Sequence, residues 1–310
     1  MANIAETSDF QGPRQNVIDF LADFTAETTP FSAAKVDDFR EILRPGTTVF
    51  ITFLPGSDFE DTIAIATRLK KEGLNPVPHL AARSIPDAAF LDEGLRRLRG
   101  EADIDEVLTI AGAVDQPLGA FSDSMQVLET GLLDKHGIKK VGVAGHPEGS
   151  PDMPDEAIAA ALTWKNDFAN RSGADVYIVT QFCFEAEPII AWDKAIRAAG
   201  NALPIRIGVP GLATIKTLLN YAKACGIGNS MMFLKKQARN VAKLMNVSAP
   251  DKLLVDLANY KATDPDCGLI GCHMYPLGGV KRTAKWTYAV VDGEFFMNPK
   301  GDGFGLTMEI

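Results

Sequence analysis

The chain is organised around Asp175–Glu185, DVYIVTQFCFE. Residues 176–180 are all β-branched or aromatic, which is typical of a strand buried on both faces in a parallel α/β sheet. The run ends at Gln181, whose amide can donate and accept hydrogen bonds, and an amphipathic helix is predicted from Glu185 to about Ala199. Ligands of parallel α/β folds bind at the carboxyl ends of strands, so Gln181 is either a functional residue or a simple strand cap.

The same pattern of a short apolar strand followed by a helix recurs along the chain. Seven further strands are predicted, at Thr25–Thr29, Thr47–Phe53, Pro76–Ala81, Glu106–Ala111, Lys140–Ala144, Ile205–Val209 and Gly268–Met274. The other predicted helices are Asn16–Phe24, Ala33–Leu43, one capped by Ser57 or Asp58 and ending at Lys71, Pro86–Leu98, Phe121–Leu133, Asp155–Asn170, Ala213–Ala224, Ser230–Met245, Pro250–Tyr260 and Val280–Ala289.

Eight alternating units predict an α/β fold, a closed (β/α)₈ TIM barrel, since alternation implies parallel strands and eight strands close the barrel. We expect an N-terminal arm over residues 1–15 and a single barrel domain over 16–310, with extra helices before the last strand. The alternative is an open doubly wound sheet. It is disfavoured because no GxGxxG follows an early strand and no GxxxxGK[ST] occurs.

Composition excludes several classes of protein. A net charge of −9 over 310 residues, with 46% hydrophobic residues, argues against a nucleic-acid surface and for one large core. No run approaches the ~18 apolar residues of a membrane span, and the start MANIAETSDF lacks the features of a secretory signal. The four cysteines form no CxxC pair, which favours a reduced, cytoplasmic protein.

Polar or glycine-containing segments follow nearly every predicted strand and should ring one mouth of the barrel. These residues are Glu27, Thr52, His79, Gly112, His146, Gln181, Pro210, Gly211 and His273. Glu27 is the strongest catalytic candidate because it is the only acid within its strand. Burial at the mouth is expected to raise its pKa, which would make Glu27 a proton donor near neutral pH.

Two other kinds of chemistry are conceivable at this mouth, metal binding and thiol catalysis. Three histidines from separate strands could bind a metal, but there is no HxH pair and few carboxylates stand near them in the pattern. Cys183 could reach a histidine, yet its surroundings, TQFCFE, resemble a packing segment more than a nucleophile site. We therefore expect neither a metal nor a thiol nucleophile.

Four motifs together resemble the flavin-dependent methylenetetrahydrofolate reductases. They are TAETTP near the start, AGHPEGSP at 144–151, VTQFCFE at 179–185 and VPGL at 209–212. The resemblance covers about residues 24–273. It implies a (β/α)₈ barrel that binds FAD at the carboxyl-end mouth and transfers hydride between the flavin and folate-bound one-carbon units.

The resemblance also implies roles for individual residues. Glu27 corresponds to the general acid that protonates the bridging nitrogen as the folate ring opens, and Gln181 to a glutamine that contacts folate and nicotinamide. Leu218 stands where the family has a phenylalanine that stacks on folate. The implied FAD contacts are Thr52, His79, Gly112, Phe121, Ser122, His146 and Lys165.

The sequence departs from the family at one loop. The R-G-D of the family is Ala111–Gly112–Ala113 in this chain, so both the arginine and the carboxylate near the flavin are missing. Asp115 follows two residues later. We expect the flavin potential and pterin binding to differ, because nearby groups tune a cofactor.

The implied function is FAD-dependent interconversion of 5,10-methylene- and 5-methyltetrahydrofolate. A tetrahydrofolate derivative is the implied substrate, with NADH or another electron carrier as second partner, and we expect a homo-oligomer. Two alternatives stay open, namely a different flavin barrel oxidoreductase and a non-catalytic folate-binding paralogue.

Overall fold

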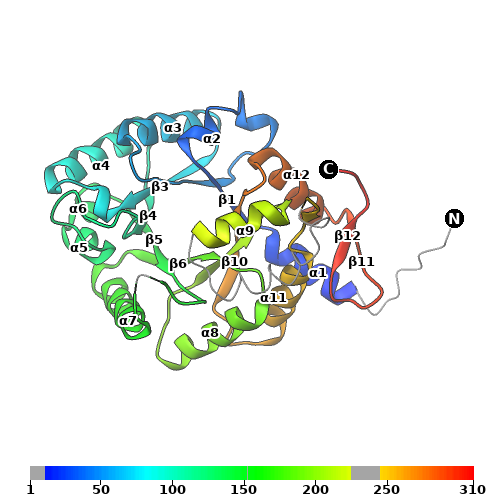
Figure 1. Ribbon diagram of the computed structural model, residues 1–310. Coiled ribbons are helices and arrows are strands. Elements are labelled where there is room, and N and C mark those ends of the chain that lie inside the picture. The colour runs from blue at the N-terminus through cyan, green and yellow to red at the C-terminus, as the bar shows by residue number, and fades with distance from the viewer. Residues whose placement is uncertain (1–10, 152, 225–244) are drawn as a thin grey trace.

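The computed structural model describes residues 11–151, 153–224 and 245–310. Eight strands form a closed barrel, in the order β1-β10-β7-β6-β5-β4-β3-β2, and all neighbouring strands of the barrel are parallel. Helices surround it (Figure 1). The predicted TIM barrel is confirmed.

The barrel strands fall where short apolar runs predicted them. Their bounds are β1 Thr25–Thr28, β2 Thr48–Ile51, β3 Asn75–Ala81, β4 Glu106–Ile110, β5 Lys140–Gly145, β6 Asp175–Phe182, β7 Ile205–Pro210 and β10 Leu269–Tyr275. Inside the barrel one cluster is formed by Phe50, Val77, Leu108, Tyr177 and Val179. The larger core lies between the outer barrel face and the helices.

The helices of the described chain follow their strands in sequence. Their bounds are α1 Gln11–Leu21, α2 Pro30–Ala33, α3 Phe59–Lys71, α4 Ala88–Ala102, α5 Ser124–Glu129, α6 Leu132–Lys135, α7 Asp155–Ser172, α8 Ala186–Ala198, α9 Ile215–Ala224, α11 Asp251–Thr263 and α12 Val280–Val291. The predicted helix Ser230–Met245 lies outside the described residues except for its last residue. None of the described helices is long and apolar enough to span a membrane.

The predicted helix Ala33–Leu43 is wrong. The chain there forms only α2 and a 3₁₀ turn, Phe39–Glu41. The cause is the side chain of Arg68 on α3, which donates to the carbonyls of Ala33, Val36 and Asp37 at 2.5–3.1 Å. These carbonyls thus accept hydrogen bonds from a side chain that is distant in the sequence, and in the described part of the chain only the Ala33 carbonyl also accepts from a nearby backbone amide, that of Val36 at 3.1 Å.

The predicted helix Phe121–Leu133 is two helices. Asp123 caps α5 through a capping box with Gln126, so the helix begins three residues later than predicted. The break between α5 and α6 comes at Gly131, whose φ is +70°. At the N-terminus α1 already begins at Gln11, within the predicted arm.

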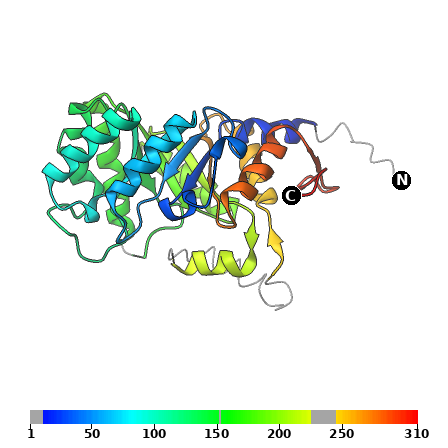
Figure 2. The same cartoon turned by 90° about the horizontal axis from the view of Figure 1, so that it is seen from above.

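Two small antiparallel pairs were not predicted. β8 (Ala213–Thr214) pairs with β9 (Val247–Ser248), and Figure 2 shows α9 and this pair projecting from the barrel body. β11 (Phe295–Met297) and β12 (Phe304–Leu306) form a C-terminal hairpin beside α1. Arg14 on α1 lies 5.1 Å from the Phe295 ring, so the two ends of the described chain pack together.

Candidate active site

Strand β1 carries Glu27 to the carboxyl end of the barrel, where its side chain is only 9% exposed. Three neighbouring segments contact its carboxylate. The Thr52 hydroxyl, just after β2, donates to Oε1. His273 Nε2, on β10, lies 3.2 Å from Oε2, and His79 Nε2, on β3, lies 3.9 Å from Oε1. The closed barrel therefore brings together four of the mouth residues that the sequence singled out, with His273 among them.

His273 is fixed on both sides of its ring. Its Nδ1 lies 2.7 Å from the Thr25 hydroxyl, and the ring packs edge-on against Phe50 and Tyr275, with centroids 4.6 and 4.8 Å away. The parallel register pairs Thr25 with His273 directly. Sequence reasoning placed His273 at the mouth but gave it no role. The contact with Glu27 could have been predicted, because the first and last strands of a closed barrel must be neighbours.

The expected upward shift of the Glu27 pKa is wrong. Burial does raise the pKa of Glu27 and is the largest single influence on it. The opposing influences prevail, chiefly the hydrogen bond from His273 and then the charges of the two histidines and the Thr52 hydroxyl, and the pKa lies below its usual value. The carboxyl group is therefore ionised at neutral pH in the absence of ligand.

His79 is buried, and among the described residues neither of its ring nitrogens has a hydrogen-bond partner. Burial lowers its pKa to about 4, against a weaker upward effect of Glu27, so the ring is neutral above that pH. A buried imidazole costs free energy when its polar atoms are unpaired. His79 is thus positioned to bind a polar ligand atom at the mouth.

The depressed pKa of His79 makes stability pH-dependent. In the unfolded chain His79 becomes protonated below about pH 6.5, whereas in the folded chain it stays neutral down to about pH 4. Folding therefore loses on the order of 3 kcal/mol from His79 as pH falls through that window. We expect urea unfolding of ligand-free protein to show this loss, and His79→Phe to show a smaller one. Equal pH slopes in the two proteins would contradict the assignment.

A second group of predicted residues gathers beside β5. Lys165 on α7 is buried, and its Nζ donates to the carbonyl of Ala144 at 3.0 Å. Burial lowers its pKa to about 8, although Asp123 opposes the shift. Burial and the nearby Lys165 charge lower the pKa of His146 to about 4. Lys165, His146 and Asp123 therefore share one electrostatic environment, in which Lys165 is the cation.

The remaining FAD candidates lie along the β4 loop. The φ of Gly112 is +90°, and a Cβ there would approach the Cβ of Ala81 to 3.1 Å, so this turn favours glycine. Phe121 is buried in the main core. Ser122 is exposed, and its carbonyl accepts from Arg83 Nε at 2.8 Å.

Gln181 stands at a β-bulge of β6. The register with β7 shifts between Val179 and Phe182, and Gln181 Oε1 accepts from the Phe182 amide at 3.1 Å. A Cβ on Gly208 would meet the backbone at Thr180 and Gln181 at 2.6–2.7 Å. The bulge thus requires glycine at 208 and directs Gln181 at the strand end.

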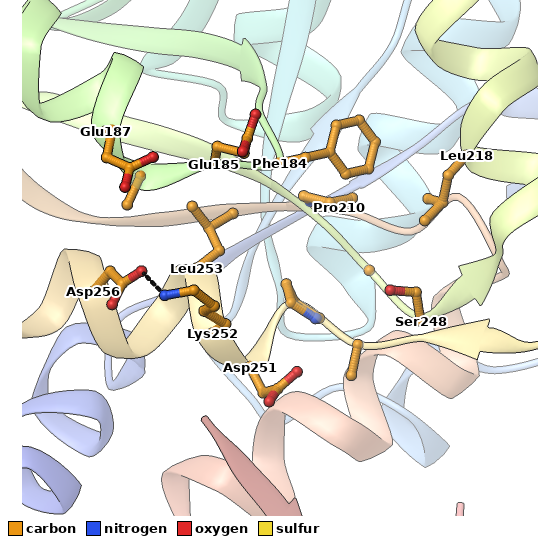
Figure 3. Close-up of a pocket in the computed structure, with 14 residues that line it drawn as sticks. Phe184, Glu185, Glu187, Pro210, Leu218, Ser248, Asp251, Lys252, Leu253 and Asp256 are labelled. Carbon is orange, nitrogen blue, oxygen red and sulfur yellow. Dashed lines mark hydrogen bonds and ion pairs between the residues drawn. The ribbon is translucent and has the colours of Figure 1, made fainter. Parts of the chain in front are cut away.

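Leu218 lines a pocket beyond the carboxyl ends of β6 and β7 (Figure 3). The pocket volume is about 350 Å³. Neither Glu27 nor Gln181 lines it, so the structure does not join Leu218 to the Glu27 cluster through this cavity.

Other chemistries gain no support from the described residues. Burial raises the pKa of the Cys183 thiol well above its usual value, which disfavours a thiolate nucleophile. Within the described ranges no three His, Cys, Asp or Glu side chains are placed to hold a metal ion, even though two histidines flank Glu27.

A sequence model of methylenetetrahydrofolate reductase matches residues 38–277 of the chain. The chain belongs to the methylenetetrahydrofolate reductase family. The matched range includes Thr52, His79 and Gln181 and begins after β1, so the Glu27 assignment rests on geometry and on the motif resemblance.

Two yeast members of the methylenetetrahydrofolate reductase family match parts of the chain. Methylenetetrahydrofolate reductase 2 of Saccharomyces cerevisiae is 25% identical over 172 residues, which is 52% of this chain and 28% of that protein. Methylenetetrahydrofolate reductase 1 of Schizosaccharomyces pombe is 36% identical over 107 residues, or 34% and 16% of the two chains. The matches span less than a third of either relative.

A solved structure shares the barrel fold. It is an uncharacterised protein from Clostridium thermocellum that binds two copies of 5-methyl-5,6,7,8-tetrahydrofolic acid. The TM-score is 0.54 at 13% identity, over 87% of this chain and 94% of that one. At this identity the likeness concerns the fold alone.

Proposed function

We propose that this chain is a FAD-dependent oxidoreductase that interconverts 5,10-methylene- and 5-methyltetrahydrofolate, with NADH or another carrier exchanging electrons with the flavin. The observation that carries the proposal is the buried Glu27 carboxylate, held by Thr52 and His273 at the mouth of a barrel of the reductase family. The methyltetrahydrofolate bound by the C. thermocellum protein of the same fold agrees with this substrate class.

The residues present fit a flavin at two points. The ring nitrogens of His79, which have no hydrogen-bond partner among the described residues, would bind a polar atom of the flavin, and this would remove the free-energy cost of their burial. The buried Lys165 ammonium, with His146 beside it, would hold the phosphates. When bound, FAD supplies a reversible carrier of hydride.

Glu27 would move the proton that folate chemistry requires. The bridging carbon accepts hydride only as its second nitrogen begins to leave, which needs a proton, and the reverse reaction returns that proton to a base. Because Glu27 is ionised without ligand, it is ready to act as this base in methylfolate oxidation. For reduction it must first be protonated, and the Thr52 hydroxyl and His273 are its hydrogen-bonding neighbours. Gln181 would orient the folate.

The deciding experiment is an anaerobic titration of the purified, flavin-loaded protein with methyltetrahydrofolate. We expect the flavin absorbance to bleach as the folate is oxidised. Bleaching by NADH but not by folate would indicate a different flavin barrel oxidoreductase. Binding of the folate by a protein that takes up no flavin would indicate a non-catalytic paralogue.

Lys165→Met is expected to weaken FAD binding about 10- to 100-fold, because it removes a charge-assisted contact to phosphate. Quenching of flavin fluorescence on titration into the flavin-free protein measures this. Lys139→Met, at the exposed opposite end of β5, is the matched control and should bind FAD normally. Equal affinity of both variants would exclude Lys165 as a phosphate ligand.

A further inference from the structure

The loop that follows β4, residues 111–122 and here called the β4 loop, has little backbone hydrogen bonding of its own. Among the residues that the structure describes, its backbone beyond Ala111 makes one hydrogen bond to another backbone group, from the Leu118 amide to the carbonyl of Arg83 at 2.9 Å. Asp115 is the one charged residue in the loop sequence. Contacts with segments outside the loop must therefore set its conformation.

Arg83 lies in the 3₁₀ turn that directly follows β3, and it contacts the β4 loop at four points. Its backbone amide donates to the Ala111 carbonyl at 2.9 Å, and its carbonyl accepts from the Leu118 amide. Its guanidinium donates to the Ser122 carbonyl at 2.8 Å and, at a longer distance of 3.4 Å, to the Val114 carbonyl. One residue thus holds the start, the middle and the end of the loop.

The β4 loop also lies directly against the segment that follows Arg83. A Cβ on Gly119 would collide with the backbone carbonyl of Pro86, so no side chain fits between the two backbones at this point. At the start of the loop a Cβ on Gly112 would likewise approach the Cβ of Ala81, the last residue of β3, to 3.1 Å. The loop therefore packs closely on the segment at the exit of β3.

This contact joins two sides of the proposed flavin site. His79 lies on β3, four residues before Arg83, and among the described residues its ring nitrogens have no hydrogen-bond partner. Three of the implied flavin contacts, Gly112, Phe121 and Ser122, lie on the β4 loop. A movement of the loop away from Arg83 would therefore change the position of these contacts relative to His79.

We propose that Arg83 is a positioning residue for the flavin, which holds the β4 loop in the conformation that binds the cofactor. This role rests on the proposed FAD-dependent function and adds to it a residue outside the motifs that carry the family resemblance. The chain has Ala111 where the loop of the family has its arginine, so here the guanidinium reaches the loop from the neighbouring strand.

Arg83→Met is expected to weaken FAD binding about tenfold. Without the two guanidinium hydrogen bonds the loop adopts the binding conformation for only a fraction of the time, and the apparent affinity falls by that fraction. Quenching of flavin fluorescence on titration into flavin-free protein measures the affinity. Wild-type affinity in Arg83→Met would overturn the proposal.

Hydrogen exchange of residues 111–122, followed by mass spectrometry, measures the loop itself. In the flavin-free state the loop of Arg83→Met should exchange faster than that of the wild type, and saturating FAD should slow the exchange in both proteins. Exchange that does not respond to FAD in the wild type would show that the loop has no part in binding the cofactor, and the proposal would be wrong.

Two further variants separate positioning from charge and from general stability. Arg83→Lys keeps the charge but lacks the planar fork of donors, so its FAD affinity should lie within about threefold of that of Arg83→Met. Wild-type affinity in Arg83→Lys would show that charge alone suffices and would overturn the positioning role. Arg68→Met is the matched control, since the Arg68 guanidinium also donates to loop carbonyls, but in segment 33–37, which carries no implied flavin contact. It should bind FAD as the wild type does, and an equal loss in Arg68→Met would assign the effect to general destabilisation.

Gly119→Ala tests the same contact from the side of the loop, and it decides the question if Arg83→Met does not fold. The added methyl group would push the loop away from Pro86 while Arg83 is unchanged. We expect FAD affinity to fall about tenfold and the loop to exchange faster. Wild-type FAD affinity in Gly119→Ala would overturn the proposal.

The two proposals fail in different ways. If the wild-type protein binds no FAD, the proposed function fails and the role of Arg83 fails with it. If the wild-type protein binds FAD and oxidises methyltetrahydrofolate, but Arg83→Met binds FAD equally well, the proposed function stands and only the role of Arg83 is overturned.

Discussion

Glu27→Gln is expected to lower turnover of methyltetrahydrofolate by about 10²- to 10⁴-fold, the usual contribution of a positioned acid or base. The amide keeps the shape of the side chain, and its single oxygen can accept from either Thr52 or His273, but it cannot carry the proton. Flavin content should be unchanged, because the proposed phosphate contacts lie beside β5. Single-turnover bleaching of the flavin measures the step directly.

Thr52→Val is the control for this prediction. It removes one hydrogen bond to the Glu27 carboxylate and leaves the proton carrier in place. Because that hydrogen bond lowers the Glu27 pKa, its loss should move the acidic limb of the pH profile upward with only a modest fall in rate. Wild-type turnover in Glu27→Gln would exclude Glu27 as the proton carrier.

Gly208→Ala is expected to destabilise the barrel by about 1–3 kcal/mol, and folate affinity should fall with it. The added methyl group would lie 2.6–2.7 Å from backbone atoms of Thr180 and Gln181, and backbone cannot turn aside as a flexible side chain can. Relief requires β6 to move away from β7, which displaces Gln181 and strains the hydrogen bond from the Tyr275 hydroxyl to the Thr180 carbonyl.

Urea unfolding and folate titration measure the two effects of Gly208→Ala. Gly100→Ala is the matched control, since Gly100 lies within α4 and a Cβ there meets nothing within 4 Å. Alanine is the better helix former, so this control should gain up to about 1 kcal/mol. Unchanged stability in Gly208→Ala would show that the bulge tolerates a side chain, and the account of Gln181 would then be wrong.

Much of the fold was predictable because its signals are local. The β-branched run before Gln181 and the apolar runs of the other barrel strands specify burial on both faces wherever they stand in the chain. The cap of α3 was predicted at Ser57 or Asp58, and Asp58 is the observed cap. The predicted helix over 33–43 is wrong because Arg68, which is distant in the sequence, donates to the carbonyl groups of Ala33 and Val36. Helix propensity depends on neighbouring residues only and does not include such a contact.

The residues that form the candidate site could be predicted from the sequence, but the pKa shifts of those residues could not. Glu27, Thr52 and His79 were each placed at strand ends, and parallel topology then brings strand ends together. The direction of the Glu27 pKa shift was predicted wrongly because burial alone was considered. Its hydrogen-bond partner His273 is 246 residues away, and the distance between the two side chains depends on closure of the barrel.

The eight-unit barrel, the family resemblance and the set of polar side chains at one mouth follow from the sequence, since each depends on a short-range pattern or motif. The closed barrel decides which of those side chains touch, in which direction the pKa of Glu27 shifts, and that neither ring nitrogen of His79 has a hydrogen-bond partner among the described residues. The physical reason is that hydrogen bonding and desolvation depend on distances of a few ångströms. Between residues far apart in the chain, only the closed barrel sets those distances.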